Sequence, residues 1–203
     1  MCGRYWIDES SEMKGIVDKM QQSSLLRRCK NASNIRVSGE VCPSEIVPVI
    51  APDKNGIQAV FPMKWGFSGK SFLINARTET AFTKQTFRNA WLRHRCIIPS
   101  AGYFEWEHCV GNSGKTTTGD KYYIHAKDAG ITWLCGLYRI EDGFPVFVIL
   151  TREPGDEIRF IHNRMPLILP DHLALEWIHP NANPKELSEK AVTDMLFEKA
   201  ADI

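Results

Sequence analysis

The chain begins with a stretch whose apolar residues repeat every three or four positions, which is the spacing of one face of an α-helix. These apolar residues are Met13, Ile16, Val17 and Met20. The pattern predicts a helix over residues 9–21, and Ser10 or Ser11 is suited to cap its N-terminus. Residues 28–45 show no regular period and are expected to be irregular.

Short apolar runs of strand length dominate the centre of the chain. The predicted strands lie at residues 46–50, 57–63, 72–76, 96–99, 103–107, 121–126, 131–139 and 144–151, with a further extended segment at 165–169. Residues 80–93 are expected to form one or two helical turns whose inward face carries Phe82, Phe87 and Trp91. A stretch rich in Gly and Thr at 109–120 predicts a mobile loop or hairpin tip.

Helical spacing returns toward the C-terminus. The predicted helices lie near residues 155–162, at 171–178 and at 185–200. Because the strands cluster between residues 46 and 169 without regular βαβ alternation, the pattern favours the α+β class. We predict a single domain over residues 1–203, built on a curved, barrel-like, mostly antiparallel β-sheet with peripheral helices. A C-terminal helical segment, about 171–203, is expected to pack on that sheet.

The composition of the 203 residues, 43% apolar and 24% charged, is that of a globular protein and excludes disorder, collagen and coiled coil. The formal net charge of +1 argues against a strongly basic, non-specific nucleic-acid binder. The charge is uneven, however. Residues 60–100 carry seven basic residues and one acidic residue, whereas residues 171–203 carry three basic and seven acidic. This distribution leaves room for local, salt-sensitive binding of nucleic acid.

Neither end of the chain nor its cysteines indicate a membrane or a metal. No run approaches about 18 apolar residues, and the N-terminus lacks the apolar core of a signal peptide. We therefore expect a cytoplasmic protein with no membrane partner. The six cysteines are widely spaced and form no CxxC pair, so no metal site is predicted.

Cys2 is the most informative residue. A small residue at position 2 permits removal of Met1, which would leave a free α-amine and a thiol on adjacent carbons. The amine, with a pKa of about 8, can attack an aldehyde to give an imine. The thiol can then close a five-membered thiazolidine ring on the same carbon, and Arg4 is a candidate cation to activate it. The alternative interpretation is a frayed chain terminus.

Four segments, taken together and in this order, resemble the SRAP family (SOS response-associated peptidase). They are Met-Cys-Gly-Arg at 1–4, Asn-Ala-Arg-Thr-Glu at 75–79, Arg-Cys-Ile-Ile-Pro at 95–99 followed by Gly-Tyr-Phe-Glu-Trp at 102–106, and His-Asn-Arg-Met-Pro at 162–166. The resemblance implies one mixed α+β domain with a barrel-like sheet. It also implies covalent capture of abasic sites in single-stranded DNA through Cys2, which would shield the lesion.

The capture of an abasic sugar requires general acids and bases, because the closed hemiacetal must open and imine formation must expel water. Glu105 is the first candidate. If it faces inward, desolvation raises its pKa and lets it act as an acid near neutral pH, whereas strand alternation alone would place it on a polar surface. His162 can protonate the opening sugar oxygen. The Asn75 amide can hold the Cys2 amine or the sugar without titrating.

Basic and aromatic residues in or beside the matching segments are candidates for contacts with DNA. The predicted DNA contacts are Arg4, Pro43, Trp65, Arg77, Trp106 and Arg164. Guanidinium groups offer a fork of donors for phosphate, with ordinary surface salt bridging as the alternative. The two tryptophans can stack on bases or wedge open a duplex junction, with a place in the core as the alternative.

Three functions remain open from the sequence. The leading hypothesis is an enzyme that crosslinks itself to abasic sites in single-stranded DNA through Cys2. The second is a thiol peptidase or autoproteolytic hydrolase that uses Cys2, Glu105 and His162, with a lyase activity as a further expectation. The third is a non-catalytic binder of single-stranded DNA. No metal or organic cofactor is expected because the cysteine supplies the nucleophiles, and the protein is expected to be a monomer.

Overall fold

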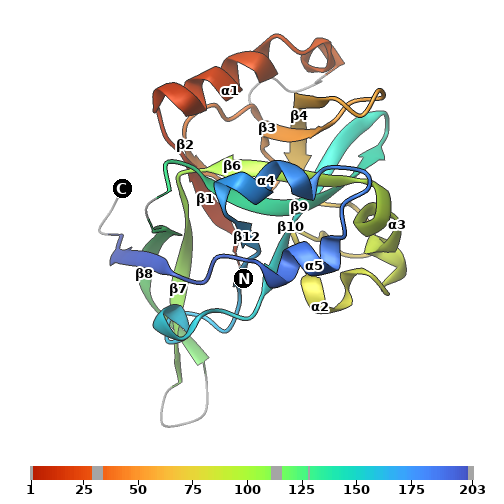
Figure 1. Cartoon of the computed structure of the whole chain (residues 1–203). Helices are drawn as coiled ribbons and strands as arrows, with labels where there is room; N and C mark the ends of the chain where they lie inside the picture. The colour runs from red at the N-terminus through yellow and green to blue at the C-terminus, as the bar shows by residue number, and fades with distance from the viewer. Residues whose placement is uncertain (1, 29–33, 111–115, 128, 201–203) are drawn as a thin grey trace.

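Two β-sheets form the body of the protein, and helices lie around them (Figure 1). The computed structural model describes residues 2–28, 34–110, 116–127 and 129–200. The eight-stranded sheet contains β3 (Ile46–Pro52), β4 (Gln58–Trp65), β5 (Asn75–Arg77), β6 (Arg95–Ser100), β9 (Thr132–Glu141), β10 (Phe144–Arg152), β11 (Met165–Pro166) and β12 (Ile168–Leu169). The five-stranded sheet has the order β13 (Met195–Lys199), β8 (Thr116–Ala126), β7 (Gly102–Val110), β1 (Arg4–Ile7) and β2 (Gly39–Val41). The helices are α1 (Ser11–Gln21), α2 (Thr78–Ala81), α3 (Gln85–Arg93), α4 (Asp171–Trp177) and α5 (Pro184–Glu189), with 3-10 turns η1 (Ser24–Arg28) and η3 (Asp156–Ile158).

Five strands of the larger sheet close into a barrel. Their order is β10–β4–β3–β6–β9, and β9 pairs again with β10. The pairs are antiparallel except for β4 with β10, which run parallel. Closure removes the exposed strand edges that an open sheet of this length would leave. The predicted curved, barrel-like and mostly antiparallel sheet of the α+β class is therefore confirmed.

Both faces of the barrel strands are buried, so their sequences read as continuous apolar runs. One set of alternate residues, including Val47, Val49 and Phe147, fills the barrel interior together with residues of the five-stranded sheet. The other set packs outward beneath α3 and α4. There Trp91 of α3 meets Trp177 of α4 edge to face, with ring centroids 5.8 Å apart.

Truncation of a barrel side chain is expected to destabilise the protein far more than truncation on a helix surface. Leu137 is fully buried on β9 and lies between β6 and β10. Leu137→Ala should cost about 2–5 kcal/mol of the free energy of unfolding, because it leaves a cavity. The matched variant Leu92→Ala, whose side chain is 55% exposed on α3, should cost less than about 1 kcal/mol. Urea unfolding of both variants checks this difference, and equal losses would contradict it.

The C-terminal segment departs from the helix predicted over residues 185–200. Only Pro184–Glu189 is helical, and Met195–Lys199 forms β13, which pairs antiparallel with β8 from Met195↔Ala126 to Lys199↔Tyr122. This pairing covers an edge of the five-stranded sheet, and its backbone hydrogen bonds outweigh the local helical spacing. The last three residues of the predicted C-terminal segment, 201–203, lie outside the described residues.

Three smaller predictions also need correction. Residues 116–120 extend β8 rather than forming a loop, and 111–115 lie outside the described residues. Phe82 is 45% exposed rather than inward, because the helical pattern breaks between α2 and α3 and Phe82 falls at the C-cap of α2. The helix near 155–162 is only the 3-10 turn η3.

The N-terminal helix is confirmed as α1, with the Ser10 hydroxyl accepting the Met13 N–H. No helix in the described ranges is long and apolar enough to cross a membrane.

Candidate functional site

Cys2 lies just before β1, the strand held between β2 and β7. It is completely buried, and its thiol donates to the carbonyl of Arg4 at 3.7 Å. Its own carbonyl accepts a hydrogen bond from Asn75 Nδ2 at 2.8 Å. Burial, together with the negative charge of Glu105, raises the pKa of the Cys2 thiol well above its usual range. Cys2 is thus fixed in the core as a protonated thiol and is not a frayed terminus.

Asn75 connects Cys2 to the barrel. It begins β5, which pairs parallel with β10 at Ile149. While Nδ2 is bonded to Cys2, Oδ1 is buried and has no hydrogen-bond donor among the residues that the structure describes. An acceptor held in this way next to Cys2 is suited to an N–H or O–H that arrives with a ligand.

Glu105 lies inward on β7, opposite Tyr122 of β8. Glu105 is only 4% exposed, so it does not lie on a polar surface of the strand, which was the alternative interpretation. The Trp106 N–H donates to Oε1 at 3.3 Å. Burial raises the pKa of the Glu105 carboxyl above its ordinary value. A carboxyl of this kind can both give and take a proton near neutral pH.

His162 is the second buried titratable group and lies between η3 and β11, where it is 6% exposed. Its Nδ1 accepts the backbone N–H of Arg164 at 2.9 Å, so the proton of the neutral ring belongs on Nε2. Burial, assisted by the nearby charge of His108, lowers the pKa of His162 to about 4. The imidazole is therefore neutral across the physiological range.

His108 lies beside His162, and no pattern in the sequence singled it out as a site residue. The residue is exposed, its ring lies against His162 with centroids 4.1 Å apart, and its backbone N–H donates to the Ile161 carbonyl at 3.0 Å. The pairing of β7 with β8 shifts register between Trp106 and His108. Such irregularities interrupt strand alternation and re-aim side chains beside functional sites. No spacing in the sequence signals this shift.

Trp65 is a core residue, so the predicted base stacking by Trp65 is corrected. Its exposed fraction is 0%, and Nε1 donates to the Ile74 carbonyl at 2.9 Å. Its ring packs on Tyr5 and stacks parallel to Phe147, with centroids 5.3 and 6.2 Å away. A base could reach this ring only if the barrel opened.

Arg164 also departs from its predicted role as a phosphate ligand. Two of its nitrogens bond the two carboxylate oxygens of Glu79, each at 2.8 Å, and one of them also donates to the carbonyl of Thr151. The residue is 9% exposed. Arg164 therefore anchors the segment after His162 to α2, and its pairing lowers the pKa of Glu79 against the opposing effect of burial.

The other predicted DNA contacts lie at or near the surface. Arg77 is exposed at the end of β5, and Trp106 is half-buried on β7. Pro43 is half-buried in the turn that follows β2. The Arg4 guanidinium bonds Glu40 and the carbonyl of Gly3, and the proposed activation of the Cys2 thiol by Arg4 stays a prediction. Within the described residues, no group of three or more His, Cys, Asp or Glu side chains is arranged to hold a metal ion.

The buried imidazole predicts a pH dependence of stability. The pKa of His162 is about 4 in the folded protein, whereas the unfolded chain binds this proton near pH 6.5. Between these values the unfolded state holds more protons, so the free energy of unfolding falls as the pH falls. Urea unfolding at about pH 4.5, 5.5 and 6.5 should show a smaller acid-induced loss for His162→Asn than for the wild type. Equal losses would contradict a neutral, buried His162.

Fold and site together define a closed-barrel protein that holds an N-proximal cysteine beside a buried carboxyl group and a neutral imidazole. The model of the SOS response associated peptidase (SRAP) family matches residues 1–201. The chain belongs to this family.

Several curated relatives are similar over much of the chain. The abasic site processing protein YoaM of Bacillus subtilis (strain 168) is 27% identical over 215 residues, which cover 100% of this chain and 88% of the relative. The abasic site processing protein YedK of Escherichia coli (strain K12) is 31% identical over 143 residues, covering 65% and 60% of the two chains. A crystal structure of a protein from Bacteroides thetaiotaomicron has the same fold, with a TM-score of 0.74, 24% identity and coverage of 99% and 93%.

Proposed function

We propose that this protein recognises abasic sites in single-stranded DNA and captures them covalently through Cys2, shielding the lesion. The observation that carries the proposal is the position of Cys2, which is buried, bonded to Asn75 and close enough to Glu105 for that carboxyl to raise the pKa of its thiol. Relatives similar to this chain are named abasic site processing proteins, which supports the same class of substrate.

The proposed reaction begins with hydrolysis of the peptide bond between Met1 and Cys2, which frees the α-amine of Cys2. The opened abasic sugar presents C1 as an aldehyde. The amine adds to C1, and loss of water from this adduct leaves a C=N bond. The nitrogen of this iminium keeps its hydrogen; the thiol gives its proton to a base and its sulfur adds to the carbon, forming C–S. The net change joins aldehyde and aminothiol as a thiazolidine and releases one water.

Glu105 is suited to two of the proton transfers. A carboxyl whose pKa is raised by burial can protonate the departing hydroxyl of the adduct. The carboxylate that results can then take the proton of the Cys2 thiol. Because burial keeps this thiol protonated, it needs a base at the moment of ring closure, and the same residue supplies that base.

His162 and Asn75 complete the proposed machinery. The neutral His162 ring carries its proton on Nε2, where it can serve the sugar oxygen during ring opening. Asn75 Oδ1, the buried acceptor beside Cys2, can hold the free amine or a sugar hydroxyl in place. Single-stranded DNA suits this arrangement because the sugar must reach a recessed residue without a partner strand in the way.

The same pKa directions argue against a thiol peptidase acting on other peptides. Such enzymes need a thiolate, commonly beside a protonated imidazole. Here the pKa of the Cys2 thiol is raised and that of His162 is lowered, which is the opposite arrangement. We therefore propose crosslinking rather than turnover of external peptides.

The test is incubation of the purified protein with a single-stranded oligonucleotide that carries one abasic site. The proposal expects a band that survives SDS and heat and contains both protein and DNA. An oligonucleotide of the same sequence without the lesion should give no such band. Absence of the band with the abasic oligonucleotide would overturn the proposed function.

A further inference from the structure

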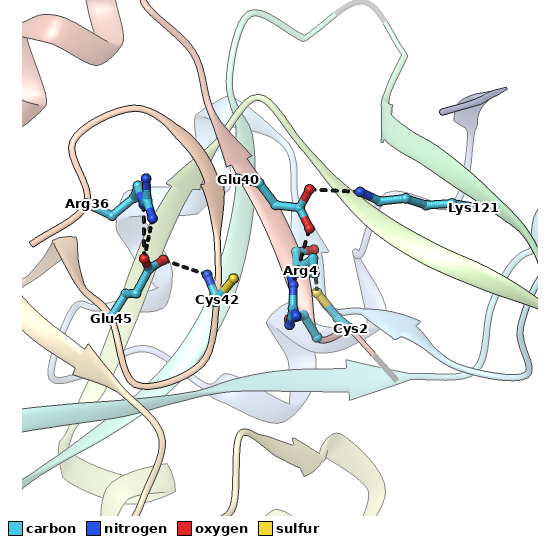
Figure 2. A network of polar contacts seen from close by, with 8 residues as sticks. Cys2, Arg4, Arg36, Glu40, Cys42, Glu45 and Lys121 are labelled. Atoms are coloured by element: carbon cyan, nitrogen blue, oxygen red, sulfur yellow. Dashed lines mark hydrogen bonds and ion pairs between the residues drawn. The ribbon is translucent and has the colours of Figure 1, made fainter. Parts of the chain in front are cut away.

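We propose that Arg4 and Lys121 form a binding site for one DNA phosphate beside Cys2, and that Glu40 occupies this site in the free protein (Figure 2). The inference rests on the proposed function and deepens it. It adds Lys121 to the residues that contact DNA and makes Glu40 an internal competitor of the DNA backbone.

The three side chains come from three strands of the five-stranded sheet. Glu40 lies on β2, Arg4 on β1 and Lys121 on β8, with β7 between β1 and β8. Their partners in register are Trp6 for Glu40, Phe104 for Arg4 and Trp106 for Lys121. The side chains of Arg4, Glu40 and Lys121 are 36%, 26% and 24% exposed, so solvent reaches all three.

Glu40 uses both carboxylate oxygens to bridge the two cations. Arg4 Nε lies 3.2 Å from Oε1, and Lys121 Nζ lies 2.7 Å from Oε2. Lys121 also makes cation–π contacts, because its amine lies 4.1 Å from the centroid of the Phe104 ring and 5.5 Å from that of Trp106. Cation–π contacts of this kind fix an otherwise flexible lysine. The two cations are thus already arranged around one anionic group.

A phosphodiester resembles the bridging carboxylate in the features that matter here. Both groups carry a negative charge and two terminal oxygens that accept from guanidinium and ammonium donors. Two cations and one carboxylate leave a local charge of +1, which attracts a phosphate but makes it compete with Glu40. The Cys2 thiol donates to the backbone carbonyl of Arg4, so the residue that supplies one of the two cations also contacts the nucleophile through its main chain.

The competition has a consequence for selectivity. Intact DNA is held only by non-covalent contacts, so competition between its phosphate and the Glu40 carboxylate weakens its binding. DNA with an abasic site forms a covalent bond and does not depend on this affinity for retention. Glu40 is therefore a specificity-determining residue that lowers occupancy by undamaged strands.

Binding of an intact single-stranded oligonucleotide tests the inference without any chemistry at Cys2. Fluorescence anisotropy at about 50 and 200 mM salt gives Kd for each variant. Glu40→Gln should tighten binding about 3- to 10-fold, because it removes the competing charge. Lys121→Met should weaken binding and reduce the magnitude of the salt slope by about one. In the Lys121→Met background the gain from Glu40→Gln should shrink markedly.

The matched control is Glu186→Gln, which removes the same charge from an exposed ion pair with Lys190 on α5. It should leave Kd within about twofold. Equal effects of Glu40→Gln and Glu186→Gln, or an undiminished gain in the Lys121→Met background, would overturn the phosphate site. Circular dichroism of each variant verifies folding. If the binding pattern holds but no variant forms an adduct with abasic DNA, the proposed function fails while the phosphate site stands.

Discussion

Replacement of Cys2 by alanine is expected to abolish the stable adduct with abasic DNA while leaving an imine that borohydride can trap. Alanine is small enough to permit removal of Met1, so the α-amine of residue 2 remains available. The amine can still attack the aldehyde, but no thiol is present to close the thiazolidine ring. The imine then hydrolyses unless it is reduced.

The assay compares wild type, Cys2→Ala and Cys135→Ala by SDS gel, each with and without borohydride. Cys135 is an equally buried cysteine that belongs to the core under the helices rather than to the site. Its variant should form the adduct without reduction. A stable, unreduced adduct of Cys2→Ala would show that the thiol is not needed. Failure of reduction to trap anything would show that the amine of residue 2 is not the attacking group.

Replacement of Glu105 by glutamine is expected to slow adduct formation about 100- to 10,000-fold, the usual contribution of a general acid–base group. Glutamine keeps the size and the acceptor oxygen of the side chain, which is buried and accepts the Trp106 N–H. It cannot donate a proton to the departing hydroxyl or take one from the Cys2 thiol. The single-turnover rate at saturating protein measures this loss.

Glu107→Gln is the matched control because Glu107 lies two residues along the same strand and is only half-buried. Its rate should stay within about threefold of the wild type. Thermal unfolding of both variants separates a chemical effect from a loss of structure. If Glu105→Gln and Glu107→Gln react at similar rates, Glu105 is not the proton-transfer group.

Local periodicity was sufficient for much of the fold. The helix at the N-terminus follows from the four apolar residues that now form its buried face. The barrel strands follow from apolar runs that are buried on both faces, as β10 shows between Pro145 and Thr151. The segments that resemble the family also carry Asn75, which bonds Cys2, and the buried residues Glu105 and His162.

The features that were missed depend on contacts between distant segments. Met195–Lys199 becomes a strand only because β8 offers an edge to pair with. His108 joins His162 through a register shift that no local pattern encodes. Trp65 and Arg164 have side chains of a type that can contact DNA. In the fold, however, Trp65 is packed in the barrel interior and Arg164 is paired with Glu79. Residue type alone cannot distinguish a group that is available to a ligand from one that the fold has used.

In the proposed adduct Cys2, freed of Met1, carries both bonds to the lesion. Tandem mass spectrometry of the nuclease-trimmed, protease-digested adduct tests this assignment. We expect an N-terminal peptide that begins at Cys2, with the sugar remnant on that residue and the mass of a thiazolidine, formed with loss of one water. A remnant on a lysine, or on a peptide that still begins with Met1, would contradict it.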